Sequence, residues 1–87
     1  MANPAVLTND NYLILFYLYN NKDKDQLIKV TQSELAEIMG YSRPTINASF
    51  KVLKEAGYLI HDKTRVGRYY LTNDAIELIE TFKKLSK

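Results

Sequence analysis

The sequence predicts an α+β fold, mostly helical, in which two short helices joined by a tight turn precede a small β-hairpin. Thr31 and Glu34 form the T-x-x-E pattern of a capping box, which starts the first of these helices. Gly40 ends that helix, because glycine adopts a left-handed backbone without steric cost, and Ser42 caps the next one. Residues 58–71 look like a two-stranded hairpin with arginines near its tip. This order of elements predicts a winged helix-turn-helix.

Residues 11–20 form the first predicted helix, capped by Asn9 or Asp10. Its YLILFYLY segment is apolar on every side, and a helix with that pattern is buried on every side. A buried β-strand is the competing interpretation, since short aromatic runs do not separate the two by period. We favour the helix, because the helix-turn-helix needs a cover, and in so small a chain part of its apolar surface must meet a second copy. The residues expected at that homodimer contact are Tyr12, Phe16 and Tyr19.

The helix-turn-helix itself is predicted over residues 32–39 and 43–56. In its second helix Ile46, Phe50 and Leu53 fall at i, i+4 and i+7, which places them on one inward face. The side chains between them remain on the outer face of this helix.

Short strands are predicted at residues 27–30, 58–61 and 68–71, the first of them pairing with the hairpin. Thr72 caps a last helix that extends to about Leu85. The expected map is one domain over residues 1–87, with a loose arm at 1–8, the helix-turn-helix at 31–57, the wing at 58–71 and the last helix at 72–86.

Composition argues against several functional classes. The chain has 87 residues and no cysteine, so it offers no disulfide and no thiolate metal site, and a reducing cytoplasm is the expected location. It shows neither a signal peptide nor the roughly 18 apolar residues of a membrane helix. The single histidine, His61, is expected at the surface of the wing, and the carboxylates form no paired pattern. We therefore expect no enzyme, no metal and no cofactor.

Charge is concentrated where the helix-turn-helix and wing would face a ligand. The formal net charge is +2, but residues 42–71 hold six basic and two acidic side chains, +4, which leaves −2 for the remainder. A basic patch on these two elements indicates double-stranded DNA as the partner. Chance clustering on a solvated face is the alternative.

The helix at residues 43–56 is the recognition helix by position. Arg43 can donate to guanine O6 and N7 or pair with a phosphate, and the Asn47 amide matches adenine N6 and N7. Arg43 could instead cap a neighbouring helix, and Asn47 could lie in a covered part of the recognition helix. The candidate DNA-binding residues of this helix are Ser42, Arg43, Pro44, Thr45, Asn47 and Lys51.

The hairpin tip is the second candidate contact with DNA. Arginine at a wing tip can enter a narrow minor groove, where the negative potential is high. A solvated hairpin tip that carries charge without a ligand is the alternative. The candidate residues are Lys63, Arg65, Gly67 and Arg68.

The sequence resembles two groups of bacterial DNA-binding proteins. T-x-x-E-L-A-x-x-M-G followed by S-R-x-T-I and L-K-E-A-G-Y-L-I is similar to winged helices of the Crp and MarR type. S-R-P-T-I-N-A-S-F, A-G-Y-L-I and T-R-V-G-R, followed by Y-x-L-T and I-E-L-I-E-T-F-K-K, resemble the TubR family of centromere-binding adaptors. The resemblance runs from the first helix of the helix-turn-helix to the C-terminal helix.

The TubR resemblance implies a homodimer that coats clustered direct repeats in plasmid or phage DNA. It further implies that the complex engages the C-terminal tail of TubZ, a filament-forming tubulin-like GTPase, and that the adaptor represses its own operon. By this resemblance residues 42–45 would enter the major groove, and Arg65 and Arg68 would contact DNA from the wing. The middle of the recognition helix would lie at the dimer interface, through Asn47, Phe50 and Lys54.

The wing is short after Arg68 and lacks a further basic residue there. An ordinary repressor of a single operator remains the main alternative, and a winged helix used only for protein contacts is a third.

Overall fold

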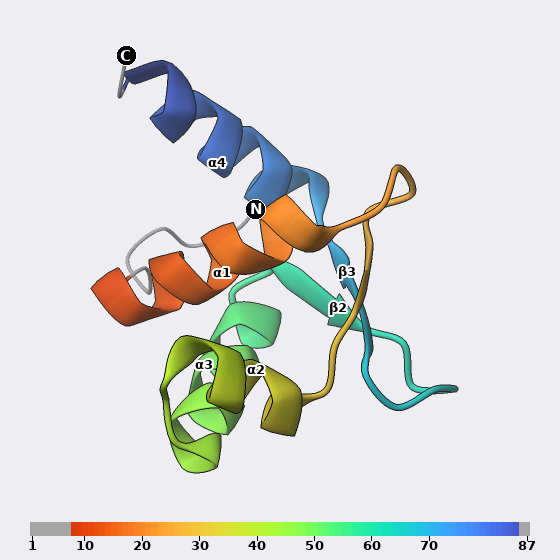
Figure 1. Ribbon diagram of the computed structural model, residues 1–87. Coiled ribbons are helices and arrows are strands. Elements are labelled where there is room, and N and C mark those ends of the chain that lie inside the picture. Colours follow the sequence, from red (N-terminus) through yellow and green to blue (C-terminus); the bar gives the residue numbers. More distant parts are fainter. Residues whose placement is uncertain (1–7, 86–87) are drawn as a thin grey trace.

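A computed structural model describes residues 8–85 and shows a winged helix-turn-helix with helices before and after it (Figure 1). The elements are α1 (Asn9–Asn21), β1 (Leu27–Lys29), α2 (Gln32–Met39), α3 (Arg43–Glu55), β2 (Leu59–His61), β3 (Arg68–Leu71) and α4 (Asn73–Leu85). Helix α1 lies between α4 on one side and the α2–α3 pair on the other, with the sheet at one end of this stack (Figure 1). Apart from Thr8, the expected arm lies outside the described residues.

The first helix is confirmed as a helix, but its cap differs from the prediction. Thr8 is the N-cap, and its hydroxyl accepts a hydrogen bond from the Asn11 amide at 3.3 Å. Asn9 and Asp10 are therefore not caps, because the extended backbone needed at a cap occurs one residue earlier and both belong to the first turn. The YLILFYLY segment is also buried on one side only within this chain, so the expectation of burial all round does not hold for the single copy.

The helix-turn-helix has the predicted capping chemistry. The Thr31 hydroxyl accepts from the Glu34 amide at 3.0 Å, and the Glu34 carboxylate accepts from the Thr31 amide at 2.8 Å. Gly40 has a φ of 74°, the left-handed conformation that glycine adopts most readily, and the Ser42 hydroxyl caps α3 through the Thr45 amide at 3.2 Å. The turn and the start of α3 are thus fixed by local hydrogen bonds.

Three short antiparallel strands form a sheet in the order β1-β3-β2. The predicted pairing of the first strand with the wing is confirmed, with Ile28 opposite Tyr69. Beyond the strands, the Val30 amide donates to the carbonyl of Gly67 at 2.9 Å. Gly67 has a φ of 73°, and a Cβ there would lie 3.2 Å from the Thr31 methyl group. This close approach joins the base of the wing to the start of α2.

The core lies between α1, α3 and the inner face of the sheet. Ile46, Phe50 and Leu53 of α3 are fully buried, as predicted, and the Phe50 ring meets the Tyr69 ring edge-on at 4.8 Å. Because Phe50 has no exposed surface, it cannot contact a second chain, which corrects its expected place at a dimer interface. In α4 Ile79 is buried whereas Leu85 remains 75% exposed, so the apolar stripe of this helix is only partly covered.

Candidate nucleic-acid interface

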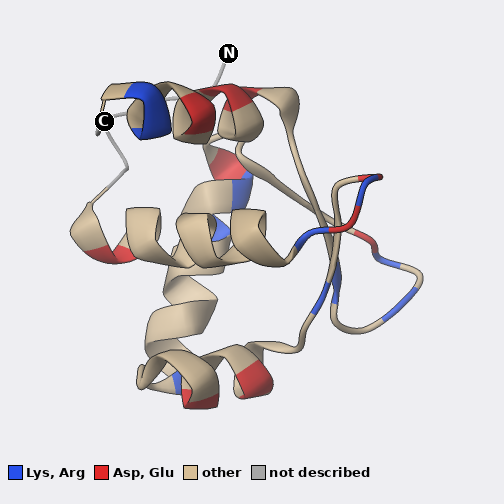
Figure 2. Ribbon diagram, turned by 45° about the horizontal axis from the view of Figure 1, so that its top comes forward, with Lys and Arg blue, Asp and Glu red and all other residues tan. Residues whose placement is uncertain are grey.

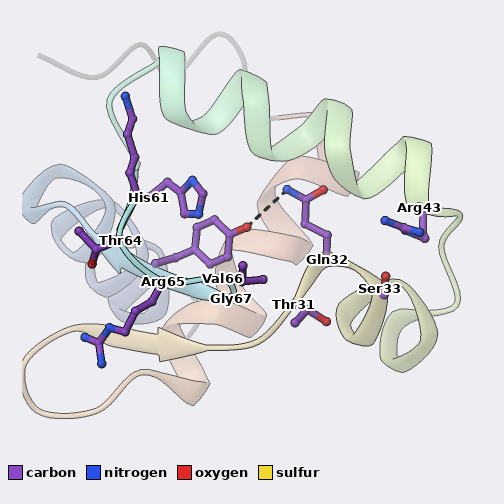
Figure 3. A pocket seen from close by; sticks show the side chains of 11 residues that line it. Thr31, Gln32, Ser33, Arg43, His61, Thr64, Arg65, Val66 and Gly67 are labelled. Carbon is purple, nitrogen blue, oxygen red and sulfur yellow. Dashed lines mark hydrogen bonds between the residues drawn. The ribbon is translucent and has the colours of Figure 1, made fainter.

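A groove of about 480 Å³ separates the helix-turn-helix from the wing (Figure 3). One wall is formed by the starts of α2 and α3, and the other by the end of β2 and the loop that joins it to β3. The groove is lined by Thr31, Gln32, Ser33, Arg43, His61, Lys63, Thr64, Arg65, Val66, Gly67 and Tyr69. Three of the predicted DNA-binding side chains, one from α3 and two from the wing, therefore share one concave surface.

The start of α3 presents donors and positive charge to solvent. Arg43 is exposed at the first position of the helix, and the first turn holds no acidic residue. Pro44 occupies the first turn, where its missing N–H has no intrahelical partner to lose, and the Ser42 hydroxyl donates to the Thr45 hydroxyl at 2.8 Å. A helix N-terminus of this kind suits phosphate oxygens, because its free amides and dipole favour negative charge.

The outer side of α3 continues this surface along the helix. Arg43, Asn47, Lys51 and Lys54 are all exposed, and their spacing places them on one side of the helix. Of these four residues Arg43 lines the groove, and the Asn47 amide donates to the side-chain carbonyl of Gln32, another groove-lining residue, at 3.1 Å. Arg43 and Asn47, the two candidate base contacts, and Lys51 are thus exposed on the same side of α3.

The floor of the groove holds a polar chain that the sequence did not predict. The Gln32 amide donates to the Tyr69 hydroxyl at 3.4 Å, drawn as a dashed line in Figure 3. Together with the bond from Asn47, this links β3, α2 and α3 through three side chains. Gln32 is an ordinary first residue of a capped helix, so no local pattern in the sequence marks it.

The wing carries its charge on an exposed loop. Residues 63–66 are all exposed, and Val66 at the tip is 84% exposed. Asp62 anchors this loop, since its carboxylate accepts from the Thr64 amide at 3.0 Å and pairs with the Arg65 guanidinium at 3.5 Å. The hydrogen bonds from Thr64, with a smaller effect of Arg65, hold the pKa of Asp62 below its ordinary value. The anchor is therefore ionised at neutral pH.

Arg68 does not add its charge to the groove as the sequence predicts, and Gly67 has a structural part in the wing. Arg68 neighbours the inward-facing Tyr69 on β3, so alternation directs it to the opposite face of the sheet. Its terminal nitrogen donates to the Gly67 carbonyl at 3.3 Å, and its buried Nε has no partner among residues 8–85. The Arg68 charge also contributes to the lowered pKa of Glu34, whose main cause is the hydrogen bond from the Thr31 amide. Gly67 is itself buried, so its part is to shape the wing.

Charge is distributed unevenly over the molecule (Figure 2). The loop between β2 and β3, and β3 itself, carry basic segments, whereas α4 is acidic along most of its length and basic only near its C-terminal end (Figure 2). His61 is half-buried and stacks on the Tyr69 ring at 4.7 Å. Within residues 8–85 no cluster of histidine and acidic side chains could hold a metal ion, and no helix is long and apolar enough to span a membrane.

Comparison with known proteins agrees with this geometry. The model of the MarR family matches residues 7–68, which include the helix-turn-helix and most of the wing. The chain belongs to the MarR family. It is also 34% identical over 76 residues to the DNA-binding transcriptional repressor TubR of Bacillus thuringiensis subsp. israelensis, an alignment that covers 84% of this chain and 69% of the relative. No solved structure matches.

The two resemblances read from the sequence are thereby confirmed. This MarR-family chain is a TubR-like winged helix-turn-helix, a DNA-binding transcriptional regulator, and the family is generally non-enzymatic. The family match ends at residue 68, where β3 begins, so the rest of β3 and the whole of α4 lie beyond the matched residues. The similarity to TubR does extend over more of the chain than the family model.

Proposed function

We propose that this chain is the centromere-binding adaptor of a plasmid or phage partition system. In this role it coats tandem DNA repeats as a homodimer, links them to the C-terminal tail of a tubulin-like GTPase of the TubZ type, and represses its own operon. The observation that supports DNA as the ligand is the groove that Arg43, Lys63 and Arg65 line. The similarity to TubR supports the partition role.

The groove suggests how the two elements divide the DNA contact. The exposed start of α3 enters the major groove with Ser42, Arg43, Pro44 and Thr45, and Lys51 follows along the same helix. Lys63 and Arg65 then approach the adjacent backbone or minor groove from the wing. Arg68 contributes through its charge, since its guanidinium is directed away from the groove.

The homodimer would use the uncovered apolar surface of α1 and α4. The Tyr12 ring stacks on Phe16 with centroids 6.0 Å apart and lies tilted against Phe82 at 5.3 Å, so these rings form one patch that crosses both helices. Leu13 is 41% and Leu85 75% exposed beside the rings on the same two helices. Burying large apolar side chains of this kind contributes about 1.5–3 kcal/mol each, so a second copy is a favourable cover.

The other expected interface residues differ in how well they fit a dimer. Tyr19 is half-buried against α4, where its hydroxyl donates to the Glu80 carboxylate at 3.0 Å. Asn47 and Lys54 are exposed on α3 and could meet a second recognition helix. Light scattering at micromolar concentration should give the mass of a dimer, and a monomer mass would contradict this part of the proposal.

A repressor of a single operator is the second candidate. It is favoured by the relative itself, which is described as a transcriptional repressor. The same groove and the same residues would serve both roles. The arrangement of binding sites on the DNA therefore distinguishes a partition adaptor from a repressor of a single operator.

Footprinting on the DNA that flanks the gene tests the proposal. A footprint that extends cooperatively over tandem repeats is the expected result, and it should be followed by co-sedimentation with the GTPase encoded nearby. One compact footprint over a promoter, with half-sites about one helical turn apart, would favour the single-operator repressor. Absence of specific binding even at low salt would contradict both roles.

A further inference from the structure

We propose that His61 is a further DNA contact, an imidazolium that donates to a backbone phosphate, and that the chain takes up a proton on this ring when it binds DNA. This inference rests on the proposed function, because it needs a duplex in the groove. The sequence predicts only that His61 lies at the surface of the wing. In the structure its side chain lines the groove between the wing and the helix-turn-helix.

His61 lies at the end of β2, where the inner face of the sheet leaves the core. It is opposite Tyr69 in the register of β2 and β3, so both side chains are on the same face. The two rings stack with their centroids 4.7 Å apart. Figure 3 shows His61 directed into the groove on the side of the wing, across from Arg43. Stacking covers one face of the imidazole, and the edge that carries its nitrogens remains for a ligand.

The nitrogens of the His61 ring are available to such a ligand. Among residues 8–85 they have no hydrogen-bond partner, and neither is among the buried, unpartnered atoms of this part of the chain. A neutral imidazole has one N–H donor, whereas an imidazolium has two and a positive charge. Protonation therefore turns the ring into a charge-assisted donor, which suits a phosphate oxygen.

The charged side chains that line the groove with His61 are all positive. They are Arg43 on α3, and Lys63 and Arg65 on the wing. The neighbouring acids are already engaged, since Asp62 accepts from Thr64 and pairs with Arg65, and Glu34 of α2 belongs to the capping box. The other charged residues on the elements packed against β2 do not line the groove; they are Lys51, Lys54 and Glu55 of α3 and Arg68 of β3.

DNA would reverse this balance of charge around the ring. Without DNA the groove is lined by positive side chains, which oppose a further positive charge. Phosphates neutralise these side chains and add negative charge, so the imidazolium form is more favourable in the complex than in the free chain. Histidine is the side chain whose charge ordinarily changes between about pH 5 and 8. Because binding takes up a proton, affinity should rise as the pH falls through this range.

The experiment measures affinity for the footprinted duplex between about pH 6 and pH 8, the range in which histidine titrates. Salt is held constant, because it also changes the affinity. The wild-type chain should bind roughly tenfold more tightly at the lower pH, within the limit of about tenfold per pH unit that one proton allows. His61 is the one histidine in the sequence, so its ring resonances identify it in an NMR spectrum. Their titration midpoint should move to higher pH when DNA is added.

Two variants of His61 test whether its charge is responsible. His61→Phe keeps an aromatic ring on Tyr69 and removes the titrating group, so its affinity should stay near the wild-type value at the higher pH. His61→Arg is always charged, so it should bind at the higher pH about as tightly as the wild-type chain does at the lower pH. The α-amino group also titrates near pH 8, and the pH dependence that remains in His61→Phe measures its share. Equal melting temperatures will show that the fold is intact.

A matched control moves the histidine to the other face of the same strand. Ile60 is the preceding residue of β2, is 54% exposed and does not line the groove. Ile60→His combined with His61→Phe therefore keeps one histidine in the chain but removes it from the groove. This double variant should show no more pH dependence than His61→Phe. If it restores the wild-type pH dependence, the effect is one of net charge and the inference is wrong.

The outcomes distinguish this inference from the proposed function. If the wild-type chain binds its site specifically but with no more pH dependence than His61→Phe, the inference is wrong and the DNA contact stands. A titration midpoint of His61 that stays in place or moves to lower pH on adding DNA would also overturn it. If the wild-type chain binds no specific site at any pH, both the inference and the proposed function fail.

Discussion

The two walls of the groove carry the same kind of charge but are held in different ways. The wall formed by α3 is a helix of 13 residues with a capped start and four buried side chains. The opposite wall is the wing loop, where residues 63–66 are all exposed and Asp62 provides the side-chain anchor. Arg43 therefore projects from a fixed backbone, whereas Lys63 and Arg65 project from a loop tied at its base.

This difference indicates a division of labour on DNA. Reading a base requires donors and acceptors held at fixed positions, which the capped start of α3 provides. Phosphate contacts tolerate movement, because a charge close to the backbone displaces counterions from many positions. We expect α3 to determine which sequence is bound, and the wing to determine how strongly binding depends on salt.

The largest expected effect comes from the residue that joins the two walls. Phe50 on α3 packs edge-on against Tyr69 on β3, and it is fully buried. Phe50→Ala should lower the free energy of unfolding by about 3–5 kcal/mol, because it removes a large buried side chain and leaves a cavity. Chemical denaturation will measure this change. A loss below about 1 kcal/mol would show that the walls are not joined through this contact.

The second-largest expected effect tests whether a charge on the α3 wall contributes more to DNA affinity than a charge elsewhere on the surface. Arg43→Ala should weaken binding to the specific site by about 1–3 kcal/mol, the scale of one arginine contact with a base or phosphate. Lys84→Ala on α4 removes one exposed positive charge outside the groove and is the control. If the two variants weaken binding equally, Arg43 acts only through net charge and the assignment to α3 is wrong.

The contribution of the wing to DNA binding should appear in the salt dependence of the affinity. Lys63→Ala combined with Arg65→Ala should flatten the slope of log affinity against log salt by about two units, one for each lost phosphate contact. Arg68→Ala should have a smaller effect on the slope, since its guanidinium is half-buried on the opposite face of the sheet. The sequence predicts that Arg65 and Arg68 contribute alike, and an effect of Arg68→Ala equal to that of Arg65→Ala would support that prediction over this one.

The smallest effect concerns the anchor of the wing at low pH. Hydrogen bonds from Thr64, and then the charge of Arg65, lower the pKa of Asp62 in the folded chain. The anchor is therefore fully present above the ordinary aspartate value of about 3.9 and is lost as pH falls through the lower folded value. The Thr64 amide resonance should titrate with a midpoint below 3.9. A midpoint at or above that value would contradict the anchor, and Asp62→Asn should abolish the titration.

Much of the fold could be predicted because its determinants are local. The Thr31–Glu34 capping box, the left-handed Gly40 and the Ser42 cap each act within a few residues, so the sequence locates both ends of α2 and the start of α3. The predicted cap of α1 is wrong by one or two residues, because threonine, asparagine and aspartate follow one another at residues 8–10 and all three are good caps.

The candidate site could be predicted only in part. The basic residues of α3 and the wing were found by position, but their orientation depends on tertiary structure. Alternation on β3 directs Arg68 away from Tyr69, so a buried Tyr69 implies an Arg68 outside the groove. The bonds of Gln32 to Asn47 and Tyr69 join residues 15 and 37 positions apart, which no local pattern reveals.

The most direct test of the account is an NMR titration of the labelled chain with duplex DNA that carries its footprinted site. The account predicts that the largest changes occur at the start of α3, at Asn47 and Gln32, and in the wing loop at residues 63–66. The outer surface of α4 should change little. Changes concentrated on α1 and α4, with none at Arg43 or in the wing, would contradict the assignment of the groove as the DNA-binding surface.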